Sequence, residues 1–185
     1  ERIAGEQEPE YVQHMLNIFI LPEITYAYMT TPLSMITIRE LAKNEPVPYD
    51  LLVMADPSRE LVDEYLPESA CFVALQAHEL IGIIVLFPLS STSAEIKNVA
   101  IKPEFQNRGI GSLLIEHAVK TAGEKGYSTI CIGTANSSTG QLYLYQKLGF
   151  ELTEIRHDFF IRNYAEPIFE HGIRAKHMLV LTRKL

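Results

Sequence analysis

The stretch that most constrains the fold runs from Glu95 to Leu114 and reads EIKNVAIKPEFQNRGIGSLL. Its first seven residues are mostly apolar and end two positions before Pro103, which is typical of a buried strand. A polar loop follows, and Gly109 and Gly111 then open an apolar-periodic segment that predicts a helix. The free N–H groups of a first helical turn can bind a phosphate, and glycines let it approach the backbone closely. This stretch therefore predicts a strand, a phosphate-binding loop and a helix.

The rest of the chain predicts a mixed α/β fold. Apolar and β-branched runs predict further strands at about 35–39, 70–77, 80–89, 128–133, 150–156 and 177–182. Helical periodicity, with capping and stop residues, predicts helices at about 49–54, 58–65, 109–125 and 136–148. The helix at 109–125 is long enough for a parallel crossover between the strands that flank it. We therefore expect an α/β (α+β) fold with a mixed, mostly antiparallel, twisted sheet of about seven strands flanked by helices.

The first 34 residues differ in pattern from the remainder. Apolar residues recur at helical spacing between Tyr11 and Ile20, which predicts a short amphipathic helix ending at Pro22. This run is too short to span a bilayer, and its acidic start is the opposite of a signal peptide, so we expect no membrane partner. We divide the chain into an N-terminal extension, 1–34, and a main domain, 35–185. The apolar stripe packs either on the main domain or on a second copy, and the second alternative would make a homodimer.

Composition narrows the classes of partner and compartment. The net charge is −7 and the isoelectric point is near 5.4, which argues against nucleic-acid binding because that function needs a basic surface. Cys71 and Cys131 both lie in apolar, strand-like runs, so we expect free, buried thiols in a reducing compartment, the cytoplasm. His171 and His177 have no cysteine or third histidine beside them to complete a ligand set, so we expect no metal.

Three kinds of phosphate-binding motif compete for the glycine loop. A Walker A loop requires a lysine after its second glycine, but Ser112 follows Gly111. A dinucleotide fingerprint matches Gly109 and Gly111, but Leu114 stands where its third glycine belongs. The acidic residue expected about twenty positions later is missing too, since 133–135 reads GTA.

The third motif fits. The run from Gln106 to Gly111, QNRGIG, resembles the acyl-CoA-binding motif Q/R-x-x-G-x-G/A of the GCN5-related N-acetyltransferase (GNAT) family, and the preceding NVAIKP is a common approach to it. A second family element follows at the expected distance, with Asn136 and then LYLYQKLGF, which includes Tyr145. The resemblance covers about Ile36 to the last strand. The tail FFIRNYAEPIFE is similar to a bacterial branch of unassigned substrate.

The resemblance implies acetyl-CoA as co-substrate. The coenzyme-binding residues that it implies lie on the strand, the loop and the two following helices: Val99, Ala100, Ile101, Gln106, Asn107, Arg108, Gly109, Ile110, Gly111, Ser112, Asn136, Tyr145 and Lys147.

The coenzyme's two parts would bind in different ways. The pyrophosphate would lie on main-chain amides from about Arg108 to Ser112, with the Arg108 guanidinium adding a charged contact or remaining solvated. In the family the strands before and after this helix splay apart, and the pantetheine arm fills the gap with main-chain bonds, here to Val99 and Ile101. The amide near Val99 would face the thioester carbonyl, a type of contact worth about 3 kcal/mol. Asn136 would bond the pantetheine amide, cap a helix, or do both.

Transfer to an amine also requires a base and an acid, because the acceptor amine is protonated at neutral pH. Glu95 is the best base by position, at the start of the strand; the alternative is a solvated strand-end carboxylate. Tyr145 matches the family tyrosine that approaches the coenzyme sulfur and protonates the departing thiolate; the alternative is a packed aromatic. Because neither cysteine lies next to an obvious base, we expect direct attack in a ternary complex and no covalent intermediate.

The acceptor pocket is expected in the segment 158–174. Carboxylates and aromatics there favour a cationic amine, and the candidate residues are Asp158, Phe160, Tyr164 and Glu170. A small-molecule amine and a protein amine fit equally well. The main alternative to an enzyme is a non-catalytic acyl-CoA-binding sensor on the same fold, since fold alone does not fix activity. A nucleotide-dependent oxidoreductase is the second alternative.

Overall fold

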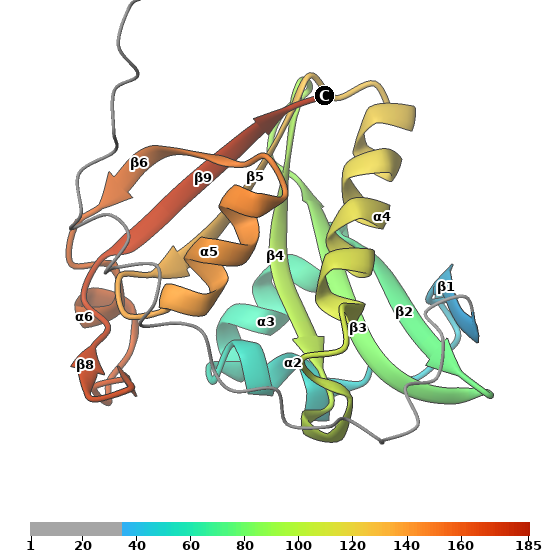
Figure 1. The fold of residues 1–185 in the computed structure, drawn as a ribbon, viewed down its shortest axis with the longest axis horizontal. Helices are drawn as coiled ribbons and strands as arrows, with labels where there is room; N and C mark the ends of the chain where they lie inside the picture. Colours follow the sequence, from blue (N-terminus) through green and yellow to red (C-terminus); the bar gives the residue numbers. More distant parts are fainter. Residues whose placement is uncertain (1–34) are drawn as a thin grey trace, which may run out of the picture. The chain divides into compact units, whose positions relative to one another are not determined.

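A computed structural model describes residues 35–185, and a seven-stranded sheet is its central element (Figure 1). The spatial order is β1-β2-β3-β4-β5-β9-β6. These strands are β1 (Ile36–Glu40), β2 (Ala70–Gln76), β3 (Glu79–Pro88), β4 (Ser93–Ile101), β5 (Thr129–Ala135), β6 (Glu151–Arg156) and β9 (Met178–Lys184). Every neighbouring pair is antiparallel except β4 and β5, which are parallel. The predicted mixed, mostly antiparallel sheet of about seven strands is confirmed.

The helices connect the strands as the sequence pattern predicts. They are α2 (Tyr49–Ala55), α3 (Arg59–Tyr65), α4 (Ile110–Glu124), α5 (Thr139–Lys147) and α6 (Phe159–Asn163), with the 3-10 turns η3 (Leu66–Glu68) and η4 (Pro103–Phe105). Of the helices described, none combines the length and the apolar character needed to cross a bilayer. The segment 158–174, expected only as a long connection, contains α6 and the small hairpin β7 (Phe169–Glu170) and β8 (Ile173–Arg174). The helix predicted over 11–20 lies outside the described residues.

The sheet separates two hydrophobic cores because alternate residues of each strand face opposite sides. Phe72 packs with α4 and α5 on one face, whereas Val73, its neighbour in β2, packs with α2 and α3 on the other. Both faces of the central strands are therefore covered by helices (Figure 1). This arrangement explains why the central strands are apolar on both sides rather than alternating.

Local signals fix the ends of the helices. The Leu61 amide donates a hydrogen bond of 3.3 Å to the Ser58 hydroxyl, which caps α3. Gly126, with φ +85°, ends α4, and the Tyr127 amide donates back to the Ala122 carbonyl over 3.1 Å. Gly149, with φ +80°, follows α5 in the same way. The predicted helix ends depend on these residues.

The pairing of β4 with β5 is incomplete. The two strands pair from Ser93 opposite Thr129 to Ile96 opposite Ile132, and beyond that point β4 pairs only with β3. At the same point Lys97 is an extra residue in β4, because Asn98 lies opposite Val85 but Ile96 lies opposite Leu86. A bulge of this kind bends a strand and ends regular pairing. The two strands therefore separate toward the carboxyl end of β4, as the family resemblance implies.

Two glycine substitutions test the packing of the central strands. A Cβ at Gly82 would lie 2.7 Å from Ile101 Cδ1 and 3.0 Å from the Ala100 carbonyl oxygen. We expect Gly82→Ala to lower the free energy of unfolding by about 1–3 kcal/mol, the usual cost of overpacking. Gly123, near the end of α4, has nothing within 4 Å of an added Cβ. Gly123→Ala should raise the free energy by up to about 1 kcal/mol, because alanine favours helix. Urea denaturation measures both, and equal stabilities would contradict this packing.

Candidate functional site

The first turn of α4 presents unpaired amides. Gly109 precedes the helix with φ +81°, a conformation that favours glycine, and its carbonyl accepts the Leu113 amide over 3.1 Å. The amides of Ile110, Gly111 and Ser112 have no acceptor within the helix, and no side chain caps them. Together with the positive end of the helix dipole, these amides form a site for an anion such as a phosphate.

The loop before α4 is held by its own side chains. Gln106 Nε2 donates a hydrogen bond of 3.0 Å to the Ile101 carbonyl, which joins the loop to the end of β4. Arg108 Nη2 donates to the Glu104 carbonyl over 2.6 Å, and its guanidinium lies 5.4 Å from the Phe105 ring centroid. The side chains of Gln106 and Arg108, two of the expected coenzyme ligands, therefore shape the loop.

The free edge of β4 faces the gap. The Lys102 amide donates to the Ile81 carbonyl over 2.9 Å, so Lys102 and then every second residue, Ala100 and Asn98, exchange backbone bonds with β3. The intervening residues, Val99 and Ile101, point their backbone groups the other way, where β5 no longer pairs. Gln106 uses the Ile101 carbonyl, so the backbone N–H and C=O of Val99 and the N–H of Ile101 remain for a ligand. Ala100 turns its backbone toward β3 instead.

A cavity of about 370 Å³ fills the space between β4 and β5, and we call it the strand-gap cavity. Val99 and Thr134 line it from the two strands, and Ser138 and Tyr145 line it from the N-cap and the last turn of α5. Tyr145 is only 5% exposed, and its hydroxyl has no hydrogen-bond partner within residues 35–185. Burial, and secondarily the charge of Glu170, raise the pKa of Tyr145, so the phenol keeps its proton at neutral pH.

The side-chain amide of Asn136 forms hydrogen bonds with the backbone of the segment before β9. Its Oδ1 accepts the Lys176 and His177 amides over 2.7 and 2.9 Å, and its Nδ2 donates to the Arg174 carbonyl over 3.2 Å. One amide hydrogen of Nδ2 is left for any other partner. The residue that caps α5 by position is Ser138, without a side-chain bond, so the alternative of Asn136 as a helix cap is wrong. Lys147 is exposed in the last turn of α5, with its ammonium 6.0 Å from the Tyr143 ring.

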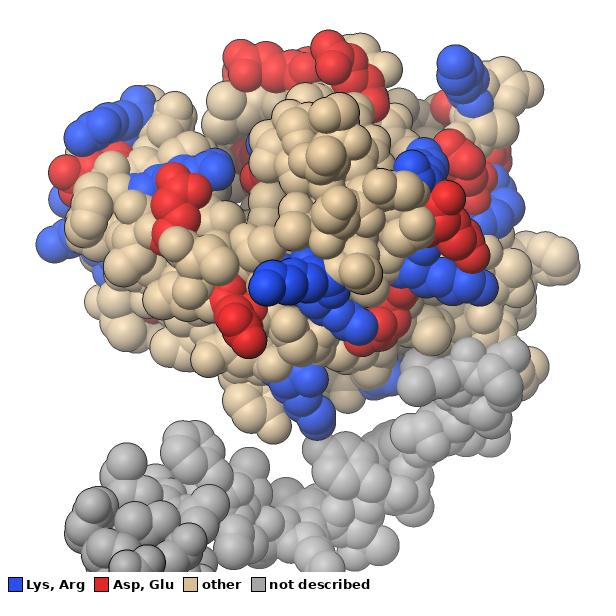
Figure 2. All heavy atoms as spheres, turned by 90° about the horizontal axis from the view of Figure 1, so that it is seen from above, with Lys and Arg blue, Asp and Glu red and all other residues tan. Residues whose placement is uncertain are grey.

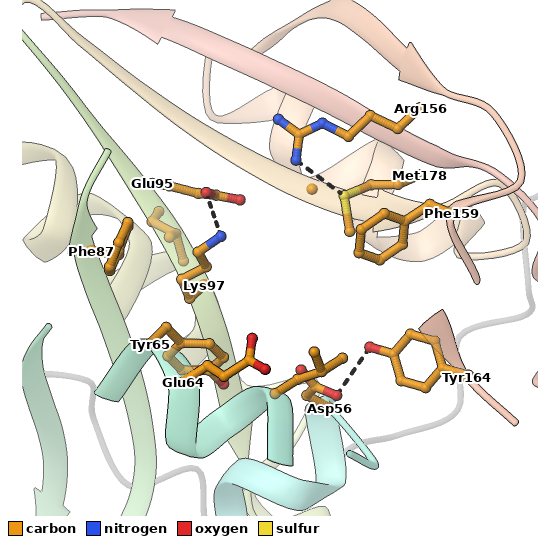
Figure 3. Close-up of a pocket in the computed structure, with 13 residues that line it drawn as sticks. Asp56, Glu64, Tyr65, Phe87, Glu95, Lys97, Arg156, Phe159, Tyr164 and Met178 are labelled. Atoms are coloured by element: carbon orange, nitrogen blue, oxygen red, sulfur yellow. Dashed lines mark hydrogen bonds and ion pairs between the residues drawn. The ribbon is translucent and has the colours of Figure 1, made fainter. Parts of the chain in front are cut away.

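A second cavity of about 320 Å³ lies over the α3 side of the sheet, and we call it the helix-side cavity (Figure 3). In Figure 3, Arg156 and Phe159 lie across it from Glu64 and Asp56. The two cavities adjoin because they share six lining residues: Asp56, Ile96, Lys97, Gly133, Tyr164 and Met178. The two cavities are therefore neighbours in the structure.

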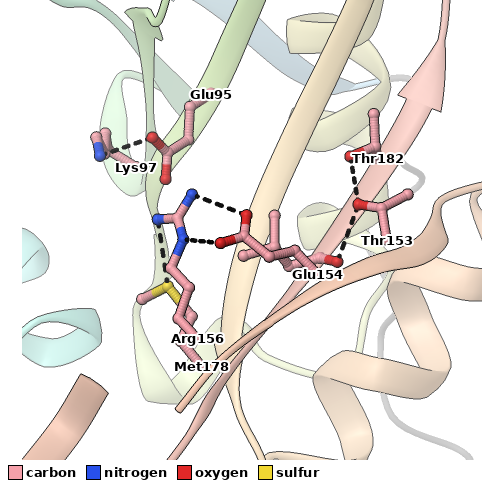
Figure 4. A network of polar contacts seen from close by, with 8 residues as sticks. Glu95, Lys97, Thr153, Glu154, Arg156, Met178 and Thr182 are labelled. Atoms are coloured by element: carbon pink, nitrogen blue, oxygen red, sulfur yellow. Dashed lines mark hydrogen bonds and ion pairs between the residues drawn. The ribbon is translucent and has the colours of Figure 1, made fainter. Parts of the chain in front are cut away.

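Charged groups inside the helix-side cavity are mostly paired (Figure 4). Glu95 is 5% exposed, and its Oε2 lies 2.7 Å from Lys97 Nζ, an ion pair without an aligned hydrogen bond at that oxygen. Arg156 donates to both oxygens of Glu154 over 3.2 and 3.4 Å, and its Nη1 contacts the Met178 sulfur at 3.9 Å. The cations near Glu95 are thus balanced by carboxylates.

A tyrosine closes one side of the cavity. The Tyr164 hydroxyl donates a hydrogen bond of 3.0 Å to Asp56 Oδ1, which joins the end of α2 to the segment after α6. The Phe160 ring stacks on Tyr164 with centroids 5.5 Å apart. Burial, followed by the charge of Asp56, raises the pKa of Tyr164, which stays protonated as a donor.

The residues expected to bind an acceptor are only partly brought together. Phe160, Tyr164 and Glu170 line the strand-gap cavity, and Tyr164 lines the helix-side cavity as well. Asp158 lines neither, because it precedes α6 and its carboxylate lies 3.5 Å from His177 Nδ1.

Four charged residues of the helix-side cavity were not among the predicted site residues: Asp56, Glu64, Lys97 and Arg156. Lys97 had a signal, since the two-residue period of a strand sets it on the face of Glu95. Arg156 stands at the end of a predicted strand, but nothing marked the side to which it points. Asp56 was used only as a helix stop, and its contact with Tyr164 joins residues 108 positions apart.

On the face in Figure 2, acidic and basic side chains are intermixed rather than separated into two regions. That face therefore presents no single-sign patch to a charged partner. Within the described residues, no group of three or more His, Cys, Asp or Glu side chains is arranged to hold a metal ion. Both cysteines are free, with Cys131 buried and Cys71 partly buried.

Comparison with known proteins gives consistent matches. A family model described as Acetyltransferase (GNAT) domain matches residues 67–152. The uncharacterized N-acetyltransferase YvbK of Bacillus subtilis (strain 168) is 47% identical over 133 residues, which cover 72% of this chain and 86% of YvbK.

Solved structures agree with these matches. A GNAT family acetyltransferase from Elizabethkingia anophelis with acetyl-CoA bound is 49% identical, with a TM-score of 0.80 over 82% of this chain and 99% of that one. A Bacillus subtilis acetyltransferase in complex with CoA is 43% identical, with a TM-score of 0.76 over 81% and 99%.

These matches agree with the structure of the site. The separated strands leave backbone groups of β4 unpaired, and the uncapped start of α4 leaves amides that suit a phosphate. The chain accordingly belongs to the GCN5-related N-acetyltransferase (GNAT) family, and it is an acetyltransferase that uses acetyl-CoA.

Proposed function

We propose that the protein moves the acetyl group of acetyl-CoA to a primary amine by direct attack of the amine nitrogen on the thioester, within a ternary complex. The observation that carries this proposal is the junction of the two cavities beside the free edge of β4. One cavity suits the coenzyme arm, and the adjoining one leaves room for an acceptor.

The coenzyme fits the groups that the protein leaves unpaired. The amides of Ile110, Gly111 and Ser112 are suited to the pyrophosphate. The backbone groups of Val99 and Ile101 are suited to the amides of the pantetheine arm, which would take the place of the missing strand neighbour. When bound, the coenzyme supplies the activated acetyl group. The Val99 amide would donate to the thioester carbonyl and stabilise the negative charge that develops there, by about 3 kcal/mol.

Tyr145 suits the role of acid. It lines the strand-gap cavity, and its phenol is protonated at neutral pH. A departing thiolate needs a proton as the carbon–sulfur bond breaks, and a neutral phenol beside it can donate that proton.

The acceptor would enter through the helix-side cavity. Its walls combine aromatic rings with carboxylates, which suits an ammonium on a short carbon chain. A volume of about 320 Å³ accommodates either a small amine or the end of a protein amine.

Release of free thiol from acetyl-CoA over a broad panel of amines tests the proposed function. We expect turnover with at least one class of primary amine. Tight binding of acetyl-CoA with no thiol release for any amine would contradict the proposal and favour a sensor. The panel should include polyamines, aminoglycosides, amino-acid derivatives and peptides with a lysine or a free N-terminus.

A carboxylate at the start of α4 tests the pyrophosphate site. Ser112→Asp adds a negative charge that the helix dipole favours by about 0.3–1 kcal/mol, so the melting temperature should stay constant or rise. The Kd for CoA should rise at least about tenfold, equal to about 1.4 kcal/mol, because the carboxylate competes for the amides and repels the phosphates. Ser112→Asn, of the same size but neutral, is the control. Equal Kd values for the two variants in calorimetry would argue against this site.

Removing one hydroxyl tests the acid. Tyr145→Phe should lower kcat by about 10²-fold or more, the usual contribution of general acid catalysis, and leave the Kd for acetyl-CoA nearly unchanged. Tyr143→Phe, on the same helix but 68% exposed, should leave kcat at the wild-type value. Steady-state kinetics with the best amine measures both. A wild-type kcat for Tyr145→Phe would exclude this role.

A further inference from the structure

A proton must leave the acceptor ammonium before attack, and two carboxylates stand near the junction of the cavities. Glu95 lines only the helix-side cavity, whereas Asp56 lines both cavities. A third carboxylate, Glu64, is exposed at the rim of the helix-side cavity. The base has to reach the nitrogen at the point where it meets the thioester, so position favours Asp56.

The contacts of Glu95 give it another task. One of its oxygens lies 2.7 Å from the Lys97 ammonium, and the Arg156 guanidinium lies beside it (Figure 4). The Glu95 side chain is buried and faces both of these cations, whereas Arg156 is also hydrogen-bonded to Glu154. Glu95 therefore serves best as a fixed counter-charge for Lys97 and Arg156.

Asp56, unlike Glu95, forms no ion pair within residues 35–185. Its Oδ1 is fixed by the Ser58 amide at 3.1 Å and by the Tyr164 hydroxyl at 3.0 Å. Its Oδ2 receives no hydrogen bond from residues 35–185, and no lysine, arginine or histidine there forms an ion pair with it. One oxygen is thus held by neutral donors while the other stays free, which is the arrangement that a positioned base requires.

We propose that Asp56 is a catalytic residue that binds the acceptor ammonium through Oδ2 and takes its proton. This assignment rests on the proposed function and extends it to a residue that the sequence motifs do not mark. The acceptor class that follows is an amine that arrives as a cation, because an otherwise unpaired carboxylate in the cavity gains a counter-charge on binding.

In the proposed step, the ammonium N–H bond breaks and its proton passes to Asp56 Oδ2, which leaves a neutral amine with a lone pair. The bond between that nitrogen and the acetyl carbon forms, and the carbon–sulfur bond breaks. The sulfur receives the Tyr145 proton, and the second proton of the new amide nitrogen restores Tyr145 through solvent. Asp56 then releases its proton to solvent, so one proton is released for each acetyl group transferred.

The surroundings of Asp56 set the sign of the pH dependence. Burial raises the pKa of the Asp56 carboxyl, and the hydrogen bonds from Ser58 and Tyr164 and the charge of Lys97 oppose that rise. Besides Lys97 and Tyr164, the titratable groups that line the helix-side cavity with Asp56 are Glu64 and Tyr65 of α3, Glu95 of β4 and Arg156 of β6. In the strand-gap cavity they are Tyr145 of α5 and Glu170 of β7. Because a base must be unprotonated, kcat/KM should fall as the pH drops through the pKa of Asp56.

The test is the pH profile of kcat/KM for wild type and four variants, with the best amine from the panel. Asp56→Asn keeps the acceptor for Ser58 and Tyr164 but cannot take a proton. We expect it to lose about 10²–10⁴-fold at neutral pH and to recover toward wild type above the pKa of the amine, where the acceptor arrives uncharged. Tyr164→Phe removes a hydrogen bond that lowers the pKa of Asp56, so its acidic limb should shift to higher pH. Glu64→Gln, at the rim of the same cavity, should keep the acidic limb at the wild-type pH whatever its effect on KM.

Glu95→Gln is the decisive comparison. Loss of the acidic limb in Glu95→Gln, with the limb retained in Asp56→Asn, would assign the base to Glu95 and overturn the proposal. An unmoved limb in Tyr164→Phe would overturn it too, and this arm does not depend on the folding of Asp56→Asn. Melting temperature and CoA affinity verify that each variant is intact. Absence of turnover by the wild type with every amine would instead refute the proposed function, and the base assignment with it.

Discussion

Parallel pairing between β4 and β5 stops after Ile96, and the site depends on that interruption. Backbone groups in a protein interior need partners, and an unpaired strand edge is costly unless a ligand or solvent satisfies it. Val99 carries such groups into the strand-gap cavity, and the backbone of Ile101 also turns away from β3 where β5 no longer pairs. In the proposed function this missing length of sheet binds an extended molecule, and its polarity is set by the backbone rather than by side chains.

The bulge at Lys97 connects this gap with the acceptor side. The extra residue ends the regular pairing, and the next residue, Asn98, turns its side chain toward the helices. Asn98 Nδ2 donates to the Leu52 carbonyl over 2.9 Å and to the Tyr65 hydroxyl over 3.2 Å, so it ties β4 to α2 and α3. These are the elements that carry Asp56 and Glu64. One irregularity in β4 thus lies both at the end of its pairing with β5 and next to the residue that ties it to α2 and α3.

Prediction from sequence succeeded where contacts are local. The strand, loop and helix between Glu95 and Glu124 have their signals within a few residues of one another. The positive φ at residue 109 favours glycine, and glycine stands there. The predicted site was incomplete where residues that are far apart in the sequence form contacts. The meeting of Asp56 with Tyr164, and the three hydrogen bonds of Asn136 to the segment before β9, leave no mark in any short window. A polar residue in such a place resembles a loop residue until the distant partner is known.

The hydrogen bonds of Asn136 fix the backbone of the segment before β9 without fixing its sequence. Through this one amide, the end of β5 holds the backbone of residues 174–177 and leaves their side chains free of the restraint. Because these hydrogen bonds use backbone atoms, they do not depend on which side chains residues 174–177 and their neighbours carry. The loop that we propose to face the acceptor can thus vary in sequence while its attachment point stays constant, as a variable loop does on an antibody framework.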